Sequence, residues 1–302
     1  KLASFLELSS ELKEKLLKTP RFILNLPLRL AQKIEKNSLD DPLLRQFVPL
    51  NEETIVSPSF ISDPVADHSF CKTPKLLKKY KGRALLLTTS ACAMHCRYCF
   101  RQNFPYETKS TLFEEELEYI AKDSSLSELI LSGGDPLSLS DQMISSLFEK
   151  INLIPHLTKV RIHTRFPLGI PERITEELLT TFSHLKAQLI FVIHSNHSKE
   201  FDKEIWDALK KIQRLGIPIL NQTVLLKGIN DHVDVLKELF ATLTDHGILP
   251  YYLHQLDRVQ GASHFEVPKE QGLHLVECLR EHLPGYAIPS YVQEIAGSTS
   301  KS

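Results

Sequence analysis

The stretch Cys92-Ala-Met-His-Cys96-Arg-Tyr-Cys99 places three of the five cysteines of this chain within eight residues. Thiolates are soft ligands, and three of them can hold three irons of a cubane iron–sulfur cluster while the fourth iron stays open to another ligand. A structural zinc site is the alternative, but it closes with four ligands and is usually marked by two separated C-x-x-C pairs, which do not occur here. Completing a zinc shell would require Cys71, Cys278 or His95, and none has a customary spacing. The spacing therefore favours an open cluster over zinc.

A short apolar run, Arg83-Ala-Leu-Leu-Leu-Thr-Thr89, leads directly into the cysteine loop and predicts a strand. From there on, strand-like runs alternate with amphipathic helical patterns, at residues 128–131, 159–164, 188–194, 218–225 and 249–256. Strict alternation predicts parallel strands with right-handed helical crossovers. Six such units predict a partial (β/α)6 barrel of the α/β class, with its chemistry at the carboxyl ends of the strands.

The residues before this barrel have a different pattern. Helical periodicity runs through residues 6–17 and 26–34, and a stretch punctuated by Pro42, Pro49, Pro58 and Pro64 follows. We expect three parts: an N-terminal helical subdomain with an extended arm (1–75), the barrel (76–285) and a C-terminal segment (286–302).

The composition is that of an ordinary globular protein, with 302 residues, 42% hydrophobic and 24% charged. A net charge of -1 gives no electrostatic footprint for nucleic acid or an anionic membrane. No stretch has the length and apolarity of a membrane span, and no secretion leader opens the chain. Few and clustered cysteines fit a reducing compartment. We therefore expect a cytoplasmic protein with neither nucleic acid nor membrane as a partner.

A glycine turn, Ser132-Gly-Gly-Asp-Pro-Leu137, follows the second barrel strand. Adjacent glycines let the backbone approach a ligand closely, and Asp135 can accept a hydrogen bond from an ammonium group. Gly-Gly-Asp-Pro is also a common turn sequence. Its position at the end of a strand favours the ligand-binding interpretation.

The cysteine spacing after a first strand, with Tyr98 before the last cysteine, resembles the radical S-adenosylmethionine (SAM) enzymes. In that superfamily the open iron binds the amino and carboxyl groups of SAM, and reductive cleavage yields a radical that abstracts hydrogen from the substrate. The resemblance implies that Gly133, Gly134 and Asp135 hold the amino group of SAM. His194 and His197 are candidates for lining the SAM pocket, although a structural role suits a histidine equally well.

Six motifs in order are similar to the lysine 2,3-aminomutase family: Cys96-Arg-Tyr-Cys-Phe-Arg101, the glycine turn, Arg161-Ile-His-Thr-Arg165, His194-Ser-Asn-His197, residues 221–231, and Pro250-Tyr-Tyr-Leu-His-Gln-Leu-Asp257. Stretches at 40–46, 79–83 and 261–265 resemble the branch that makes β-lysine for translation elongation factor P (EF-P), the EF-P β-lysylation branch. The resemblance runs from about residue 80 to the end of the sequence. It implies an isomerase that moves the amino group of free L-lysine from Cα to Cβ.

The cofactors implied by this resemblance are a [4Fe-4S] cluster on Cys92, Cys96 and Cys99, SAM, and pyridoxal 5′-phosphate (PLP). Arg101 matches the arginine that binds the substrate carboxylate, for which a guanidinium fork is well suited. Asp257 and Glu294 match the two acids that receive the ε-ammonium group of lysine. The family has aspartate where this chain has Glu294.

Lys301 stands where the family has the lysine that binds PLP through its amine, which allows imine exchange with the substrate. Tyr80 and Arg83 are expected to contact PLP by stacking and by phosphate pairing. The glycine-rich run before this lysine is reduced to Gly297-Ser-Thr-Ser, and a lysine so near a chain end is ordinarily a mobile surface charge.

The resemblance also implies partners: a reductant protein for the cluster, and a functional link to EF-P and its separate ligase. Three alternatives remain open. A glutamate 2,3-aminomutase would share the cofactor motifs but should lack Asp257 and Glu294. A PLP-independent radical SAM tailoring enzyme would have no use for Lys301. A zinc-binding module would be no enzyme at all.

Overall fold

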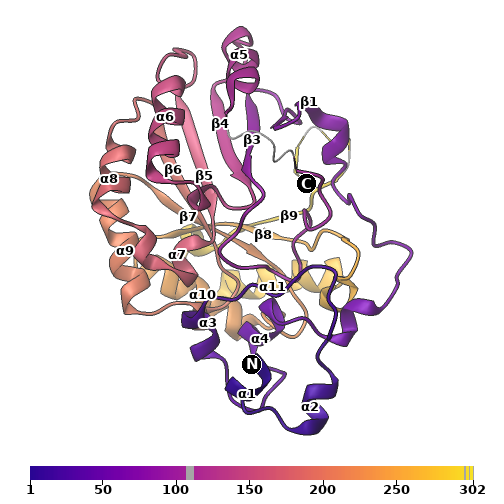
Figure 1. The fold of residues 1–302 in the computed structure, drawn as a ribbon. Coiled ribbons are helices and arrows are strands. Elements are labelled where there is room, and N and C mark those ends of the chain that lie inside the picture. The colour runs from indigo at the N-terminus through magenta and orange to yellow at the C-terminus, as the bar shows by residue number, and fades with distance from the viewer. Residues whose placement is uncertain (107–111, 296, 299, 302) are drawn as a thin grey trace.

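Nine strands form one sheet in the computed structural model, which describes residues 1–106, 112–295, 297, 298, 300 and 301 (Figure 1). The strand order follows the chain from β1 to β9. Strand β2 is antiparallel to both of its neighbours, β1 and β3, and the strands from β3 to β9 are all parallel. The strands are β1 Cys71–Thr73, β2 Leu76–Leu77, β3 Arg83–Thr89, β4 Glu128–Gly133, β5 Lys159–Thr164, β6 Gln188–His194, β7 Ile219–Val224, β8 Leu249–His254 and β9 Ser290–Val292.

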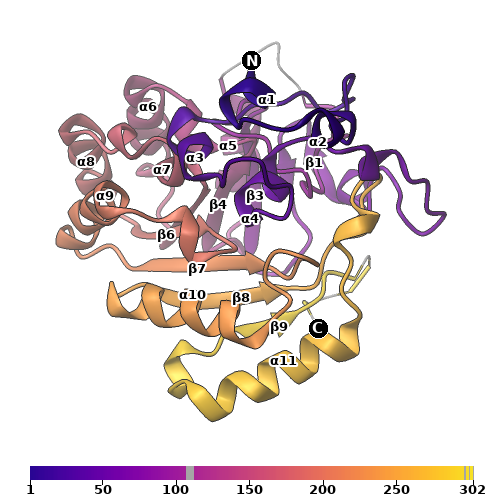
Figure 2. The same ribbon diagram turned by 90° about the horizontal axis from the view of Figure 1, so that it is seen from below.

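Helices follow each of the strands from β3 to β8, so the prediction of a partial (β/α)6 barrel is confirmed. They are α5 Glu114–Lys122, α6 Asp141–Ile151, α7 Phe166–Gly169, α8 Glu176–Ser183, α9 Lys203–Arg214, α10 Val233–Asp245 and α11 Lys269–His282. Figure 2 shows α10 and α11 lying along β7, β8 and β9 on the outer face. Side chains of Ser140, Thr175 and Asp202 accept from backbone N–H groups in the first turns of α6, α8 and α9, which fixes where these helices begin.

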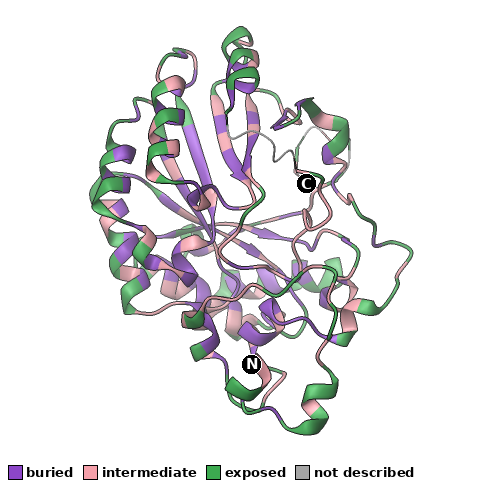
Figure 3. Cartoon of the chain, in the orientation of Figure 1, coloured by how far each residue is buried: buried purple, intermediate pink, exposed green. Residues whose placement is uncertain are grey.

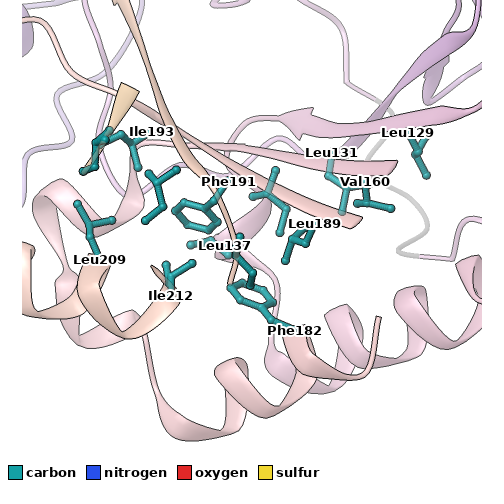
Figure 4. Close-up of a cluster of buried hydrophobic side chains, with 14 of the residues drawn as sticks. Leu129, Leu131, Leu137, Val160, Phe182, Leu189, Phe191, Ile193, Leu209 and Ile212 are labelled. Carbon is teal, nitrogen blue, oxygen red and sulfur yellow. The ribbon is translucent and has the colours of Figure 1, made fainter. Parts of the chain in front are cut away.

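The main core lies between the strands and the outer helices, as Figure 4 shows for β4, β5 and β6. Parallel register aligns Leu129, Val160 and Leu189 in one row, with Leu131, Ile162 and Phe191 in the next. Phe191 is fully buried, and burying such a side chain contributes about 1.5–3 kcal/mol. Because side chains alternate along a strand, the intervening positions point into the barrel. Arg161 and His163 of β5 are two such positions.

The N-terminal region has a second hydrophobic core, formed mainly by α3 Leu28–Lys33, α4 Pro42–Phe47 and the buried side chains of Leu6 and Leu8, with α1 Leu2–Phe5 only partly buried against it. Met94, from the cysteine loop, is buried in it. The N-terminal region is therefore packed onto the cysteine loop. Figure 3 shows this region with exposed outer turns and a buried inner side.

Two expectations for the N-terminal region were wrong in detail. Within residues 6–17 only α2 Ser10–Glu14 is helical, because Glu7 adopts φ 54 and Ser9 caps a new helix. The proline-rich stretch, expected to be extended, contains α4, where Asp41 caps the helix and Pro42 occupies the first turn. It also contains the 3₁₀ helices Asn51–Thr54 and Asp67–Phe70. In the part of the chain that the structure describes, no helix is long and apolar enough to cross a bilayer.

Candidate active site

A cavity of about 550 Å³ opens at the carboxyl ends of the parallel strands. All of the site residues expected from the sequence except His197 line it: Tyr80, Arg83, Cys92, Cys96, Tyr98, Cys99, Arg101, Gly133, Gly134, Asp135, His194, Asp257, Glu294 and Lys301. They come from the last residues of β4 and β6, from the segments that follow β3, β4, β8 and β9, and, for Tyr80 and Arg83, from the start of β3 and the segment before it. His197 instead caps the 3₁₀ helix Ser198–Glu200, where its Nδ1 accepts from Lys199 N at 3.1 Å.

The N-terminal region holds the backbone of the cysteine loop. Asn25 Nδ2 donates to Cys92 O at 2.9 Å, and His95 N donates to Asn25 O at 2.9 Å. The Arg97 side chain, only 1% exposed, forms an ion pair with Glu53, with Nε 2.7 Å from Oε1. These contacts hold the backbone of the loop against the N-terminal region.

All three loop cysteines have free thiols facing one cavity, which fits a cluster that takes one thiolate for each of three irons. Burial raises the pKa of Cys99 to about 11 and that of Cys92 above its ordinary value. The thiols of Cys92 and Cys99 therefore stay protonated at neutral pH unless a metal displaces the proton. Arg165 Nη1 lies 2.9 Å from Cys96 Sγ and places a positive charge beside that ligand.

The residues required to complete a zinc shell have other contacts. His95 Nδ1 lies 2.8 Å from Ile23 O, and its ring stacks on Phe22 with centroids 4.4 Å apart. Cys71 Sγ donates to Asp67 O, and Cys278 Sγ lies 3.6 Å from His274 Nε2 on α11.

The glycine turn lies directly against the start of the cysteine loop. Gly134 N donates to Thr89 O at 2.6 Å, and Asp135 N donates to Ala91 O at 2.7 Å. A Cβ at Gly134 would overlap Ala91 O. Gly133 has a positive φ of +121, and a Cβ added to it would lie only 2.6 Å from Thr89 O. Only glycine allows this close approach of two backbones.

Asp135 accepts hydrogen bonds from four donors within the protein: Leu137 N, Thr164 Oγ1, Arg165 N and Phe166 N. Two carboxylate oxygens have about four acceptor positions. The geometry therefore favours Asp135 as a residue that joins β4 to the end of β5, while the prediction that it receives the amino group of SAM stays a prediction.

Lys301 is half-buried among acidic and aromatic groups that line the cavity. Its Nζ lies 3.8 Å from Glu294 Oε2 and 3.5 Å from His254 Nε2, over the ring of Tyr252 at 5.0 Å. Burial lowers the pKa of Lys301 to about 8, against the opposing effect of Glu294 and Asp257. A neutral amine is thus accessible near physiological pH, which fits a lysine that reacts with a carbonyl group.

The two acids of this region have different surroundings. Glu294 Oε1 accepts from Tyr80 Oη at 2.5 Å and forms an ion pair with Lys79. Although burial opposes it, these contacts lower the pKa of Glu294. Asp257 is affected mainly by burial, which raises its pKa to about 7 despite the nearby charge of Lys301.

Several cavity residues were not assigned from the sequence: Asp67, Lys79, Arg161, His163, Arg165 and His254. Arg161 and His163 could have been found from the alternation along β5, since both occupy inward positions. His163 Nδ1 lies 3.3 Å from His194 Nε2, and burial lowers the pKa of both rings, so they are neutral at physiological pH. Nothing in the sequence marks Asp67 as a site residue, because it lies in a stretch without hydrophobic periodicity.

The cavity wall contains polar atoms that a bound group would satisfy. His163 Nε2 and Gln222 Oε1 are buried without a hydrogen-bond partner among the described residues. Buried polar atoms are ordinarily paired, so such atoms are expected where a ligand completes a site. The guanidinium of Arg83 lies 4.7 Å from the ring centre of Tyr80. A guanidinium group can bind a phosphate and an aromatic ring can stack on another ring, so this pair suits a phosphorylated ring such as PLP.

Residues 86–239 match the family model described as the Radical SAM superfamily. The L-lysine 2,3-aminomutase of Escherichia coli (strain K12) is 41% identical over 285 residues, which cover 93% of this chain and 83% of that protein. The L-lysine 2,3-aminomutase of Haemophilus influenzae (strain Rd) is 40% identical over 284 residues, covering 93% of this chain and 84% of that protein.

Among solved structures, Streptococcus suis SuiB bound to S-adenosylmethionine has a similar fold, with a TM-score of 0.53. The match covers 72% of this chain and 52% of that chain, at 13% sequence identity. At that identity the likeness concerns the fold alone.

Proposed function

The chain belongs to the L-lysine 2,3-aminomutase family within the radical SAM superfamily, and from that premise we propose that it converts free L-lysine to β-lysine with PLP as the carrier of the amino group. It is an isomerase that acts through radical SAM chemistry. Membership implies a [4Fe-4S] cluster, SAM and PLP as cofactors. The observation that carries the proposal is the arrangement of Arg101, Asp257 and Lys301 around the same cavity as the three cysteines.

When bound, the cluster with SAM supplies a carbon-centred radical, and PLP supplies a carbonyl for the amine and a ring that stabilises an unpaired electron. The residues of the chain provide position and charge. Arg101 binds the lysine carboxylate through its guanidinium, which cannot lose its charge. Asp257 and Glu294 bind the ε-ammonium group. Holding both ends of a flexible substrate fixes its β-carbon relative to the cluster side of the cavity.

Lys301 is proposed as the PLP lysine. Its lowered pKa supports this role, because only the neutral amine attacks a carbonyl carbon. Tyr80 and Arg83 are proposed to hold the ring and the phosphate, with Lys79 as a further cation beside them. Gly133, Gly134, Asp135, Tyr98 and His194 are proposed to line the SAM site next to the cluster.

The wider setting is also a proposal. The stretches 40–46, 79–83 and 261–265 support a role in making β-lysine for EF-P, with attachment by a separate ligase and with a reductant protein serving the cluster. Free cysteines throughout the described chain support a reducing compartment, for which we propose the cytoplasm.

Product analysis tests the proposed reaction. Protein reconstituted anaerobically with iron, sulfide, PLP, SAM and a reductant is incubated with L-lysine or L-glutamate, and β-amino acids are quantified. We expect β-lysine from lysine and no β-glutamate from glutamate. Lys301→Ala is the matched control, expected to keep iron and SAM cleavage while forming no β-lysine. Formation of β-glutamate would make the protein a glutamate 2,3-aminomutase. Accumulation of 5′-deoxyadenosine without any β-amino acid would indicate a PLP-independent tailoring enzyme.

A further inference from the structure

Arg101 forms a buried ion pair at the cluster end of the cavity. Its Nε donates to Asp67 Oδ2 at 2.8 Å, and the two side chains are only 10% and 9% exposed. Arg101 Nη1 lies 3.4 Å from Ser132 Oγ, a longer and weaker contact. Both members of the pair line the cavity. Asp67 therefore contacts the Nε edge of the Arg101 guanidinium group.

The chain holds Asp67 in this place by several independent contacts. Ala66 adopts φ 55 and ψ 39, a left-handed conformation that a residue with a side chain rarely adopts. Asp63 accepts from Asp67 N at 3.0 Å and from His68 N at 3.2 Å, and the His68 ring stacks on Phe104 with centroids 5.3 Å apart. Strained backbone persists where the surroundings over-determine it, commonly at functional sites.

A guanidinium group has five N–H donors in a rigid fork. With Nε bonded to Asp67, the planar group is fixed about its side-chain bonds. Apart from the long contact of Nη1 with Ser132, the terminal Nη donors have no hydrogen-bond partner among the described residues and remain for a ligand. We propose that Asp67 is the positioning residue that presents the terminal edge of Arg101 to the carboxylate of the amino acid substrate. This inference rests on the proposed function, because it assigns Asp67 to the same substrate site.

The proposal separates the two ends of the substrate. Loss of Asp67 should weaken recognition of the carboxylate without weakening recognition of the ε-ammonium group. Glu294 is bonded to Tyr80, and the charge of Asp67 raises the pKa of Asp257, so its removal leaves Asp257 no less ionised. A residue that merely supports the fold would weaken both equally. Two lysine analogues distinguish these cases: L-lysinamide, which lacks the carboxylate charge, and L-norleucine, which lacks the ε-ammonium group.

The experiment measures equilibrium binding of L-lysine, L-lysinamide and L-norleucine to the full chain loaded with PLP, without SAM, by titration calorimetry. For Asp67→Ala we expect lysine affinity to fall about tenfold, as for a lost hydrogen bond to a charged group. The preference for lysine over lysinamide should fall by a similar factor, and the preference for lysine over norleucine should not fall. Asp67→Asn, which keeps an acceptor but no charge, should show a smaller change in the same direction.

Asp123→Asn is the matched control, since Asp123 forms an ion pair with Lys78 outside the cavity, and it should leave both preferences unchanged. Equal losses of affinity for lysine and lysinamide in Asp67→Ala, unchanged lysine affinity, or a wild type without preference for lysine over lysinamide would each overturn the proposal. Should Asp67→Ala fail to fold, the same two affinity ratios, lysine over lysinamide and lysine over norleucine, are measured in Asp67→Asn and test the proposal. If the ratios behave as expected but no β-lysine forms in the product assay, the role of Asp67 stands and the proposed reaction fails.

Discussion

Two titratable groups in the cavity, Asp257 and Lys301, have pKa values that burial moves towards neutrality, to about 7 and about 8. Loss of water favours the uncharged form of each group, and the opposite charge of the other partly restores the charged form. The charge of the substrate site therefore changes within the physiological pH range. Small shifts in pH should change both substrate binding and stability.

Asp257→Asn should make the cofactor-free protein more stable at high pH. The folded state holds a proton on Asp257 up to about pH 7, whereas an unfolded aspartate loses it near pH 3.9, so the wild type loses stability between these values as pH rises. The stability difference between variant and wild type should grow by roughly 1.4 kcal/mol per pH unit in that window and stay constant above it. Urea unfolding at several pH values measures it. A difference independent of pH would contradict the burial of this carboxyl.

Lys301 should react with PLP as a weakly basic amine. Borohydride trapping of the PLP adduct should rise with pH around a midpoint near 8, because the neutral amine is the reactive form. Peptide mapping should locate the trapped group on Lys301, and Lys301→Arg should carry none. A midpoint near the ordinary lysine value of about 10.4 would mean that the amine is solvated and not held in the cavity.

Single residues show what the sequence could and could not predict about the site. The motifs identified the cavity-lining residues, because the cysteine loop and the glycine turn follow strands and the resemblance to a known family supplied the rest. Their partners were not predictable: Tyr80 and Glu294 are 214 positions apart, and their hydrogen bond depends on the barrel bringing two distant segments together. Asp67 was missed because nothing in its own stretch of sequence marks it, and its contact with Arg101 is visible only in the folded structure.

At the scale of elements, the cysteine loop depends on a buried ion pair from outside the barrel. Glu53→Gln removes one partner and leaves the Arg97 charge buried, which should cost about 3 kcal/mol of unfolding free energy and lower the iron content after reconstitution. Glu52→Gln is the neighbouring control: this acid is 44% exposed, 3.6 Å from Arg45, and its loss should cost under about 1 kcal/mol. Chemical denaturation and iron analysis test both. Equal small losses would show that the loop is held by other contacts.

The glycine turn makes a second prediction about elements. Gly134→Ala forces a Cβ onto Ala91 O, so the turn and the cysteine loop must move apart. We expect SAM binding to weaken by more than about tenfold, measured by equilibrium dialysis of the reconstituted protein. Gly285→Ala, where no heavy atom lies within 4 Å of the added Cβ, should bind SAM as the wild type does. Unchanged SAM affinity in Gly134→Ala would place SAM elsewhere.

Elements with a clear hydrophobic period were predicted well. The strands β3, β5 and β6 have the bounds predicted from their apolar runs, and β7 and β8 lie within theirs. The strands β1, β2 and β9 have only two or three residues, too few to show an alternating hydrophobic pattern. They form strands because they pair with a neighbouring strand, which the sequence does not reveal. The helix expected over residues 6–17 failed because leucine spacing does not reveal the left-handed turn at Glu7.

At the scale of the whole molecule, the N-terminal region and the cysteine loop share one hydrophobic core through Met94. A fragment covering residues 76–302 would expose that side of the loop and lose Glu53 and Asn25, which contact it. We expect the fragment to retain much less iron than the full chain after identical reconstitution, even where circular dichroism shows a folded barrel. Full iron content in the fragment would show that residues 1–75 are a separate domain in function as well as in sequence.

The strand order of the sheet has a consequence for how the protein is made. Since neighbours in the sheet are neighbours in the chain, each strand from β2 onward finds its partner already synthesised when it leaves the ribosome. The three thiols emerge about 200 residues before the amine of Lys301, which at ~5–20 residues per second is an interval of roughly 10–40 s. During translation the metal-binding half of the cavity thus exists without its opposite wall, open to iron donors and to oxygen alike.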